Sequence, residues 1–299
     1  MKLLKFASID VGSNAVRLLF TNVFETDEGP VYRKLSLVRV PIRLGEDAFE
    51  HGLISDKKAE QLVNTMRSFK HLMEVHQVQA YKAYATSAMR EAANSEEIVK
   101  TIKVLTDLDL EIVSGDIEAN TISTESMPEP LPKFKEAVFV DVGGGSTEMT
   151  LLKEGHKVSS VSFKIGTIRM LHNGVSSELW SQFDDWFKSH NLIGSQVPLI
   201  GTGGNINKLL KILREESTDY HISVRSLEDF LSTLEDIPYD ERIVKYILNP
   251  DRADVIVHAC KIFVKAAANL GSKNIHIPKV GLSDGIARSL YKEFKKALL

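Results

Sequence analysis

An apolar strand that ends in an aspartate and runs into a Gly/Ser turn occurs twice in this 299-residue chain. The first copy ends at Asp10 and turns through Gly12, and the second ends at Asp141 and turns through Gly143. In both copies an apolar strand returns from the turn and a third one follows, which predicts a β-hairpin extended by another strand. Helical and strand-like spacing alternate after the first copy. This duplication predicts an α/β protein with two related domains, each of which offers one glycine loop to a shared cleft.

Residues 127–132 contain three prolines and lie between the two copies. A stretch of this kind is typical of a loop near a domain boundary. We expect a first lobe at residues 1–121 and a second lobe at residues 122–283, with a helix at about residues 284–299 that packs back on the first lobe. Within the second lobe the apolar spacing predicts helices at residues 177–189, 206–215, 226–237 and 252–270.

The charge balance is close to neutral, with 37 Lys and Arg residues against 40 Asp and Glu residues. General nucleic-acid binders and proteins of anionic membrane surfaces carry a basic excess, so neither kind of partner is expected. No apolar run is long enough to span a bilayer, and the first residues lack the features of a signal peptide. The single cysteine, Cys260, excludes an internal disulfide and is typical of a reducing compartment. We therefore expect a cytoplasmic protein, and the sequence leaves a homodimer open.

The two glycine turns have the composition of anion-binding loops. Glycine allows backbone N–H groups to converge on a ligand, and short polar side chains in the same turns add donors. Two ordinary hairpin turns would look similar, but the recurrence of one design after an aspartate favours phosphate binding. The residues predicted to bind phosphate here are Gly12, Ser13, Asn14, Gly143, Gly144, Gly145, Ser146 and Thr147.

Carboxylates stand beside both turns. Asp10 and Asp141 end the two strands, and Glu148 lies on the strand that returns from the second turn. Anionic side chains at a phosphate site would repel the substrate unless a cation were bound there, and carboxylate oxygens suit Mg²⁺ or Mn²⁺. We therefore expect Asp141, Asp10 and Glu148 to hold the metal ion. The alternative is an aspartate that only forms a turn, which applies best to Asp10.

Three further places offer contacts to a phosphate chain. Ser87 and Arg90 lie where an apolar strand passes into a helix, and Arg17 lies on the strand after the first turn. Arginine can bind phosphate through two hydrogen bonds, although either arginine could instead pair with a carboxylate such as Glu91. Gly203 belongs to a glycine turn between a short strand and a helix, which suits an anion or a nucleotide and is equally compatible with a tight turn.

In their order along the chain, the motifs resemble those of the exopolyphosphatase/guanosine pentaphosphate phosphatase family, the Ppx/GppA family. They are IDVGSN from Ile9, ATSAMREA from Ala85, DVGGGSTE from Asp141, GTGG from Gly201 and GLSDG from Gly281. The third motif is highly specific, and the match covers nearly the whole chain. The resemblance implies an α/β fold of duplicated actin-like ATPase (ASKHA, ribonuclease H-like) domains that flank a cleft, which agrees with the repeat.

The family's catalytic glutamate lies in a Ser-Gly-x-Glu-Glu-Ala segment, which reads SGDIEA from Ser114 in this chain. The resemblance therefore implies that Glu118 is catalytic, and it shows Ile117 where the family has a further glutamate. Asp284 stands where the family usually has glutamate. The chain ends at Leu299, so we expect it to lack the helical extension of long family members.

Taken together, these expectations describe hydrolysis of a terminal phosphoanhydride bond. Glu118 would deprotonate the attacking water while the metal ion neutralises the phosphate oxygens. The substrate is left open between inorganic polyphosphate and guanosine pentaphosphate. Two other functions stay open: an ATP-dependent kinase of the same fold with its nucleotide at residues 201–204, and a non-catalytic sensor of polyphosphate or an alarmone. The presence of Glu118, Asp141 and Glu148 favours catalysis over sensing, because a pure binder of polyanions gains nothing from three carboxylates at its site.

A preference for short polyphosphate chains is also expected. Contact with many successive phosphates needs a basic track, and binding at many sites makes the affinity steeply salt-dependent. The chain has neither a basic excess nor a Lys/Arg-dense run, and only Arg17, Arg90 and either Lys164 or Arg169 are close to the motifs. We therefore expect contact with few phosphates and release of the chain after one or a few cuts.

Overall fold

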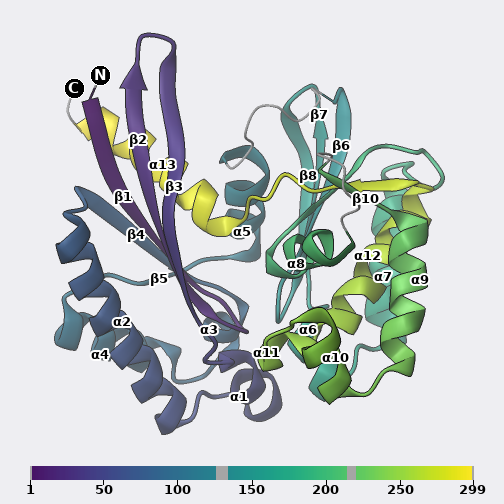
Figure 1. Ribbon diagram of the computed structural model, residues 1–299, viewed down its shortest axis with the longest axis horizontal. Helices are drawn as coiled ribbons and strands as arrows, with labels where there is room; N and C mark the ends of the chain where they lie inside the picture. The colour runs from purple at the N-terminus through teal and green to yellow at the C-terminus, as the bar shows by residue number, and fades with distance from the viewer. Residues whose placement is uncertain (1, 126–133, 214–219, 298–299) are drawn as a thin grey trace.

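The computed structural model describes residues 2–125, 134–213 and 220–297 of the chain. Two lobes lie side by side, each built on one β-sheet with helices packed against it (Figure 1). Each lobe has its own hydrophobic core. None of the helices in the described ranges is both long enough and apolar enough to cross a bilayer.

The first sheet contains the first predicted hairpin and its extension. Its strands are β1 (Lys2–Val11), β2 (Val16–Thr26), β3 (Gly29–Val40), β4 (Ala80–Ala85) and β5 (Glu111–Ile112). They lie in the order β3-β2-β1-β4-β5, with β1, β2 and β3 antiparallel and with β4 and β5 parallel to β1. Most of β1 is buried on both faces, as expected for a central strand that is covered on both sides.

The helices of the first lobe follow β3, β4 and β5 along the chain. They are α1 (Leu44–His51), α2 (Asp56–His76), α3 (Ser87–Glu91), α4 (Ser95–Thr106), α5 (Gly115–Asn120) and the short π-helix η1 (Thr121–Glu125). α2 begins after Ser55, as predicted, and buries Leu62, Met66 and Phe69. Because this spacing puts the apolar side chains on one face, burial of that face holds α2 against the core.

The second sheet repeats the first. Its strands are β6 (Glu136–Val142), β7 (Thr147–Lys153), β8 (His156–Phe163), β9 (Leu199–Thr202), β10 (His221–Ser223) and β11 (Asn274–His276). The order β8-β7-β6-β9-β11 matches β3-β2-β1-β4-β5 with the same pairings, and β10 is added antiparallel to β11 at the edge. The predicted α/β duplication of actin-like domains is confirmed, because one pattern of strands builds the same topology twice.

The helices of the second lobe agree in part with the prediction. They are α6 (Thr167–His172), α7 (Ser177–Ser189), α8 (Gly204–Leu213), α9 (Val224–Asp236), α10 (Tyr239–Tyr246), α11 (Pro250–Ala253) and α12 (Ile256–Leu270). The continuous helix predicted at residues 252–270 is wrong: it divides into α11 and α12 at Asp254, whose carboxylate binds Arg43 of the first lobe. α10 was not predicted: in the described structure none of its side chains is fully buried, and only Ile243 and Tyr246 pack against the core, both partly exposed.

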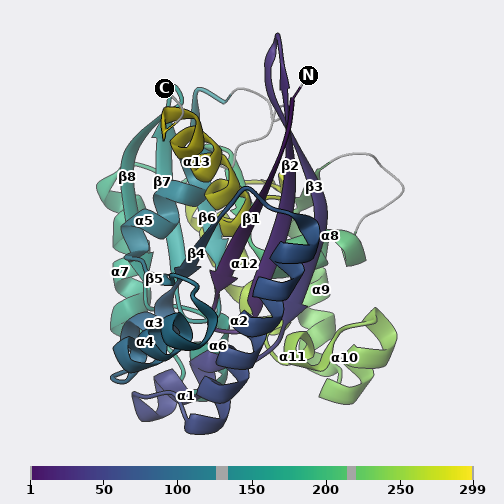
Figure 2. The same ribbon diagram turned by 90° about the vertical axis from the view of Figure 1, so that its left-hand side faces the viewer.

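The terminal helix α13 (Leu282–Ala297) returns from the second lobe and packs on β1, β2 and β4 (Figure 2). The ring of Phe6 meets those of Tyr291 and Phe294, with centroids 6.2 and 5.4 Å apart. Near its start, Gly285 lies so close to the carbonyl of Thr121 that a Cβ would overlap it. The last glycine of the GLSDG motif therefore serves the packing of α13 on η1.

The predicted lobe boundary between residues 121 and 122 falls inside η1 and stays a prediction. The proline-dense residues 127–132 lie outside the described ranges. α5 comes just before this point in the chain, yet it packs on β8 of the second sheet, where Gly115 lies against Ser162. Ile122 of η1 packs with Tyr84 of β4, so the crossing between the lobes contacts both sheets.

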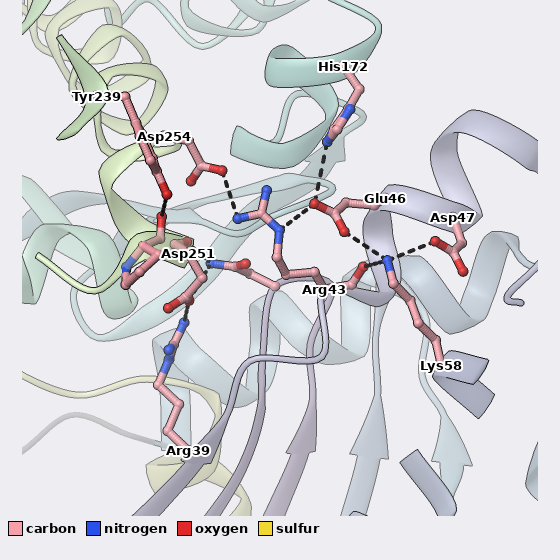
Figure 3. Close-up of polar contacts among 11 residues, drawn as sticks. Arg39, Arg43, Glu46, Asp47, Lys58, His172, Tyr239, Asp251 and Asp254 are labelled. Atoms are coloured by element: carbon pink, nitrogen blue, oxygen red, sulfur yellow. Dashed lines mark hydrogen bonds and ion pairs between the residues drawn. The ribbon is translucent and has the colours of Figure 1, made fainter. Parts of the chain in front are cut away.

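A network of ion pairs joins the lobes at one end of their interface (Figure 3). Arg43 is central: its Nε donates to Glu46 Oε1 at 2.5 Å, and its Nη1 lies 2.8 Å from Asp254 Oδ2 in the second lobe. Lys58 adds an ion pair of 2.8 Å to Glu46, and His172 of the second lobe lies 3.8 Å from the same carboxylate. These shared charges hold α1 against α6 and the turn between α11 and α12.

Candidate active site

A cleft of about 800 Å³ lies between the two lobes, and the turns of both duplicated hairpins reach it. In each turn a glycine N–H donates to a carbonyl three residues further on. Gly12 donates to Ala15 O at 3.2 Å, and Gly143 donates to Ser146 O at 2.9 Å. The duplication therefore extends from the sheet topology to the backbone of the two loops.

The two loops approach each other closely. A Cβ on Gly144 would lie 3.0 Å from the Cβ of Ser13 and 3.2 Å from the backbone nitrogen of Asn14. The absence of that Cβ leaves backbone N–H groups accessible to an anion between the loops. Gly166, just before α6, supports the second loop, since a Cβ there would overlap the backbone of Gly144. The sequence reasoning missed Gly166, which belongs to none of the recognised motifs.

The two hairpins differ in the one pair of residues that decides where a cation can bind. In the first hairpin Asp10 stands opposite Arg17, and the two form an ion pair of 2.6 Å. In the second hairpin Asp141 stands opposite Glu148 at the equivalent place. Negative charge is therefore neutralised within the first hairpin, whereas two carboxyl groups stand together in the second.

Burial and mutual repulsion raise the pKa values of three carboxyl groups in the cleft. The pKa of Asp141 rises to about 7, first because of burial and then because of Glu148. Burial and Glu148 also raise the pKa of Glu118 well above its usual value. Burial raises the pKa of Glu148, although hydrogen bonds from Ser146 and Ser162 oppose the rise. A bound cation would relieve this repulsion, because it stabilises the ionised form of each group.

The predicted metal ligands are not gathered into one cluster. Among residues 2–125, 134–213 and 220–297, no three His, Cys, Asp or Glu side chains are grouped so that they could hold a metal ion. Asp10 is turned to Arg17, which donates to it. Asp141 and Glu148 still fit Mg²⁺, because this ion is commonly held by one or two carboxylates together with substrate phosphates and water. The predicted set of three protein ligands is therefore corrected to these two.

Glu118 reaches the cleft on the short helix α5. Ser114 caps this helix by accepting a backbone hydrogen bond in its first turn. Gly115 packs tightly against Ser162 of β8, and the hydroxyl of Ser162 donates to Glu148 at 2.7 Å. The packing of α5 on β8 therefore brings the carboxyl groups of Glu118 and Glu148 together, although the two residues come from different lobes.

Two neighbours of Glu118 do not line the cleft. Ile117 is 43% exposed outside it, so the absence of the usual family glutamate takes no carboxylate from the cleft. Arg90 donates to Val113 O at 2.7 Å, and its Nη1 lies 3.6 Å from Glu118 Oε2. The predicted contact of Arg90 with the phosphate chain stays a prediction, and the structure adds that its Nη1 positions the segment that carries Glu118.

Two residues of the second loop also face away from the cleft, contrary to prediction. The hydroxyl of Thr147 donates to Ile165 O, and Gly145 is covered by Phe49. Both stabilise the loop from inside the protein. The other predicted residues line the cleft: Asp10, Gly12, Ser13, Asn14, Arg17, Ser87, Glu118, Asp141, Gly143, Gly144, Ser146, Glu148 and Gly203.

Basic side chains form a wall of the cleft that the sequence did not indicate. They are Arg17, Lys34, Arg39, Lys208, Lys211, Lys245, Arg252 and Lys279. The expectation of only a few cations near the substrate is therefore wrong in number. It is also wrong in identity, since Lys164 and Arg169 instead pair with Glu91 at 3.3 and 2.7 Å. No local pattern marks this wall, because several separate elements each contribute one or two of its residues.

Arg17, Lys34 and Arg39 of this wall pair with Asp10, Asp284 and Asp251, whereas Arg252 is short of negative charge. Burial and the nearby charges of Arg39 and Arg17 together lower the pKa of Arg252 to about 10, although Asp251 opposes this. A bound phosphate would supply the missing negative charge. A Cβ on Gly204 would lie 3.2 Å from the guanidinium of Arg17 and 3.5 Å from that of Arg252. The two arginines thus converge beside the glycine turn at Gly203, where the sequence predicted an anion contact.

A model of the Ppx/GppA phosphatase family matches residues 23–294. A bifunctional 3-dehydroquinate synthase/phosphatase of Fusobacterium nucleatum is 27% identical in an alignment of 281 positions that covers 84% of this chain and 41% of that protein. A putative exopolyphosphatase of Haemophilus influenzae is 22% identical over 98% of this chain and 93% of that protein. Exopolyphosphatase 2 of Mycobacterium tuberculosis is 25% identical over 97% of this chain and 99% of its own length.

Solved structures show the same fold. The Aquifex aeolicus member of the Ppx/GppA family has a TM-score of 0.77 at 23% identity, over 98% of this chain and 99% of that one. An exopolyphosphatase of Cytophaga hutchinsonii has a TM-score of 0.81 at 21% identity, over 97% of this chain and 98% of that one. The predicted fold and the resemblance are both confirmed. The chain belongs to the Ppx/GppA phosphatase family.

Proposed function

We propose that this protein hydrolyses terminal phosphoanhydride bonds of a polyphosphorylated compound, either inorganic polyphosphate or guanosine pentaphosphate. The observation that supports this most directly is a single cleft that combines two facing glycine loops, three carboxyl groups with raised pKa values and a wall of cations. Membership of a phosphatase family and relatives named exopolyphosphatases support the same reaction.

The terminal phosphate would lie between the two loops, with backbone N–H groups near Gly12 and Gly144 as donors. Mg²⁺ or Mn²⁺ at Asp141 and Glu148 would neutralise charge on the phosphate oxygens while the bond breaks. Asp10, already paired with Arg17, would keep that arginine oriented beside the loop. The protein thereby places positive charge on both sides of the phosphate before any bond is broken.

Glu118 would accept the proton of the attacking water. Burial and the charge of Glu148 raise the pKa of Glu118 well above the usual value, which makes its carboxylate a stronger base. The charge of Arg90 opposes the rise and so favours the ionised form that the base needs. Within the described part of the chain, Oε2 of Glu118 has no hydrogen-bond partner, so this oxygen is free to receive the proton.

The phosphates behind the one that is cut would lie along the basic wall. Arg252, Arg39 and Lys208 come from both lobes and line the same cleft. They offer a longer anion more contacts than the sequence indicated. The preference for short chains was expected because few basic residues lay near the motifs, so this preference is now a question for experiment. After each cut, inorganic phosphate leaves and the shortened chain can stay or dissociate.

Phosphate release tests the proposal. We would supply polyphosphates of defined length and guanosine pentaphosphate, each with Mg²⁺ or with Mn²⁺, and add no acceptor. Release that Glu118→Gln abolishes supports hydrolysis, because a kinase would need an acceptor. Binding of both compounds without release would instead support a sensor. Products of a long chain, resolved on a gel, separate gradual shortening from processive digestion.

A further inference from the structure

The side chain of Arg169 on α6 connects the second glycine loop to the first lobe. Its Nε donates to Gly145 O at 3.0 Å, and its Nη2 donates to Glu91 Oε1 at 2.7 Å. Its guanidinium also lies over the ring of Phe49, 4.0 Å from the ring centroid. Glu91 belongs to α3 and Phe49 to α1, so two of the three contacts are with the first lobe and one is with the loop.

The backbone of α6 holds the same loop. The N–H groups of Ile168 and Arg169 donate to Gly144 O at 2.8 and 3.2 Å. Together with the side-chain bond to Gly145 O, α6 therefore binds two successive carbonyl groups. In a trans peptide the N–H group that follows a carbonyl points in the opposite direction. The N–H groups of Gly145 and Ser146 therefore point away from α6.

The directions of these N–H groups matter for an anion in the loop, because Gly144 and Ser146 line the cleft. Donors stabilise developing charge best when they are oriented before the reaction, since reorienting them during the reaction costs free energy. The bond from Arg169 to the loop depends on where the guanidinium lies, and Glu91 and Phe49 hold it there.

An ordinary ion pair between the lobes would need only one charge on each side. The side chain of Arg43 is of this kind, because it pairs with the carboxylates of Glu46 and Asp254. Arg169 differs, since it also uses a carbonyl of the loop and the face of an aromatic ring. A planar guanidinium can make these contacts together, whereas a lysine ammonium is a single point charge.

We infer that Arg169 is a positioning residue that couples the closure of the two lobes to the shape of the second glycine loop. The inference rests on the proposed hydrolysis and adds to it a residue that acts through the loop. While the lobes are together, Glu91 and Phe49 hold the guanidinium, and the guanidinium holds Gly145 O. When the lobes separate, the guanidinium loses two of its three partners and the loop loses a restraint. Hydrolysis is thereby confined to a phosphate that both lobes enclose.

Four variants test the inference. Arg169→Gln removes the guanidinium, and Arg169→Lys keeps a charge that can pair with Glu91 but lacks the planar group. Arg43→Gln is the first control, because it also removes an arginine that joins the lobes. Lys164→Gln is the second control, because Lys164 is the other partner of Glu91 and its side chain is 64% exposed.

Phosphate release would be measured with Mg²⁺ and with whichever of inorganic tetrapolyphosphate and guanosine pentaphosphate the wild type hydrolyses faster. Arg169→Gln should lower kcat about 10–100-fold and change KM less than about threefold, because misplaced donors cost most in the transition state. Arg169→Lys should lower kcat by a similar factor, with a urea midpoint close to that of the wild type. Arg43→Gln should lower the urea midpoint at least as much as Arg169→Gln does, but kcat by less than about threefold. Lys164→Gln should change neither value.

A wild-type kcat in Arg169→Gln would overturn the inference. Equal losses of kcat in Arg169→Gln and Arg43→Gln would also overturn it, because closure of the lobes alone would then be responsible. Full turnover in Arg169→Lys would do the same, since a charge without the planar group would then be enough.

If the wild type releases no phosphate from either compound, the proposed function fails, and amide hydrogen exchange decides the inference separately. Peptides that contain residues 143–146 would be followed by mass spectrometry in the metal-free protein. Arg169→Gln should raise their exchange rate about tenfold, because the loop opens more often, and Arg43→Gln should leave it near the wild-type rate. An unchanged rate in Arg169→Gln, or an equal rise in both variants, would contradict the inference.

Discussion

Asp141 should destabilise the folded protein when no cation is bound, and Asp141→Asn should remove this destabilisation. The carboxyl group stands opposite Glu148 in the second hairpin, and the two repel each other. A neutral amide of nearly the same shape removes one of these charges. The expected result is unusual for a residue of the proposed active site, because the substitution should stabilise the metal-free protein while it abolishes turnover.

The size of the expected stability change follows from the pKa of Asp141. Burial and Glu148 raise the pKa of Asp141 from 3.8 to about 7. Because the folded value is the higher one, the favourable contribution of the protonated form is fully present below pH 3.8 and is lost as the pH rises through 7. At 1.36 kcal/mol per pKa unit, the shift lowers the free energy of unfolding, relative to its value below pH 3.8, by at most about 4 kcal/mol at pH 8 and about 1.5 kcal/mol at pH 5. The real cost is smaller, because Asp141 is only half-buried and keeps contact with water.

Urea unfolding in buffer with a chelator, at pH 8 and at pH 5, measures the effect. Both tryptophans, Trp180 and Trp186, lie on α7 of the second lobe, so their fluorescence reports on the lobe that carries Asp141. Asp141→Asn should be more stable than the wild type by about 2–4 kcal/mol at pH 8, and by less at pH 5. Added Mg²⁺ should stabilise the wild type at pH 8 more than it stabilises the variant.

Asp229→Asn is the control, because Asp229 is exposed on α9 of the same lobe and undergoes the same chemical change. Its effect should be within about 0.5 kcal/mol at both pH values. The reasoning would be refuted by an Asp141→Asn variant that is no more stable than the wild type at pH 8. A gain of equal size at pH 5 and pH 8 would also refute it, since the gain would then not come from the charge.

Three other predictions test the loops, the base and the junction of the lobes. Glu118→Gln should lower kcat about a hundredfold or more with little change in KM, because a positioned general base contributes that much; near-normal turnover in a phosphate-release assay would remove its role. Gly166→Ala should lower kcat/KM more than tenfold, because its Cβ would push against the backbone of Gly144; wild-type kinetics would contradict the support given to that loop. Arg43→Gln should lower the free energy of unfolding by about 1–3 kcal/mol, because it leaves Glu46 and Asp254 without their shared cation; an unchanged urea midpoint would show that the network does not stabilise the closed lobes.

The duplication could be predicted because its signal is local. A strand, an aspartate, a glycine turn and a returning strand occupy fewer than about 25 residues, and each copy of the pattern determines its own hairpin. The hairpins at Asp10 and Asp141 therefore placed the first three strands of both sheets, and the motifs brought Glu118 into the expected cleft. α10 was missed because its contact with the core is weak, since only Ile243 and Tyr246 of its described residues pack there and neither is fully buried.

Roles of single side chains depended on partners that are distant in the sequence. Arg90 was expected to hold phosphate, and the structure adds a positioning contact that the motif did not indicate, because its Nη1 donates to Val113 O and lies beside Glu118. The motif alone could not separate these roles, because the same guanidinium suits phosphate, carboxylate and carbonyl oxygen equally well.

The sequence by itself determined the fold class, the two glycine loops and the presence of carboxylates beside them, since all three follow from residues that are neighbours in the chain. Only the tertiary structure decided how charge is distributed in the cleft. Strand register pairs Asp10 with Arg17 but leaves Asp141 beside Glu148, and the meeting of the lobes gathers eight basic residues from separate elements around the site. Electrostatic interactions depend on distance in space, so a chain of nearly neutral composition presents, once folded, a basic wall in the same cleft as the carboxyl groups of Glu118, Asp141 and Glu148.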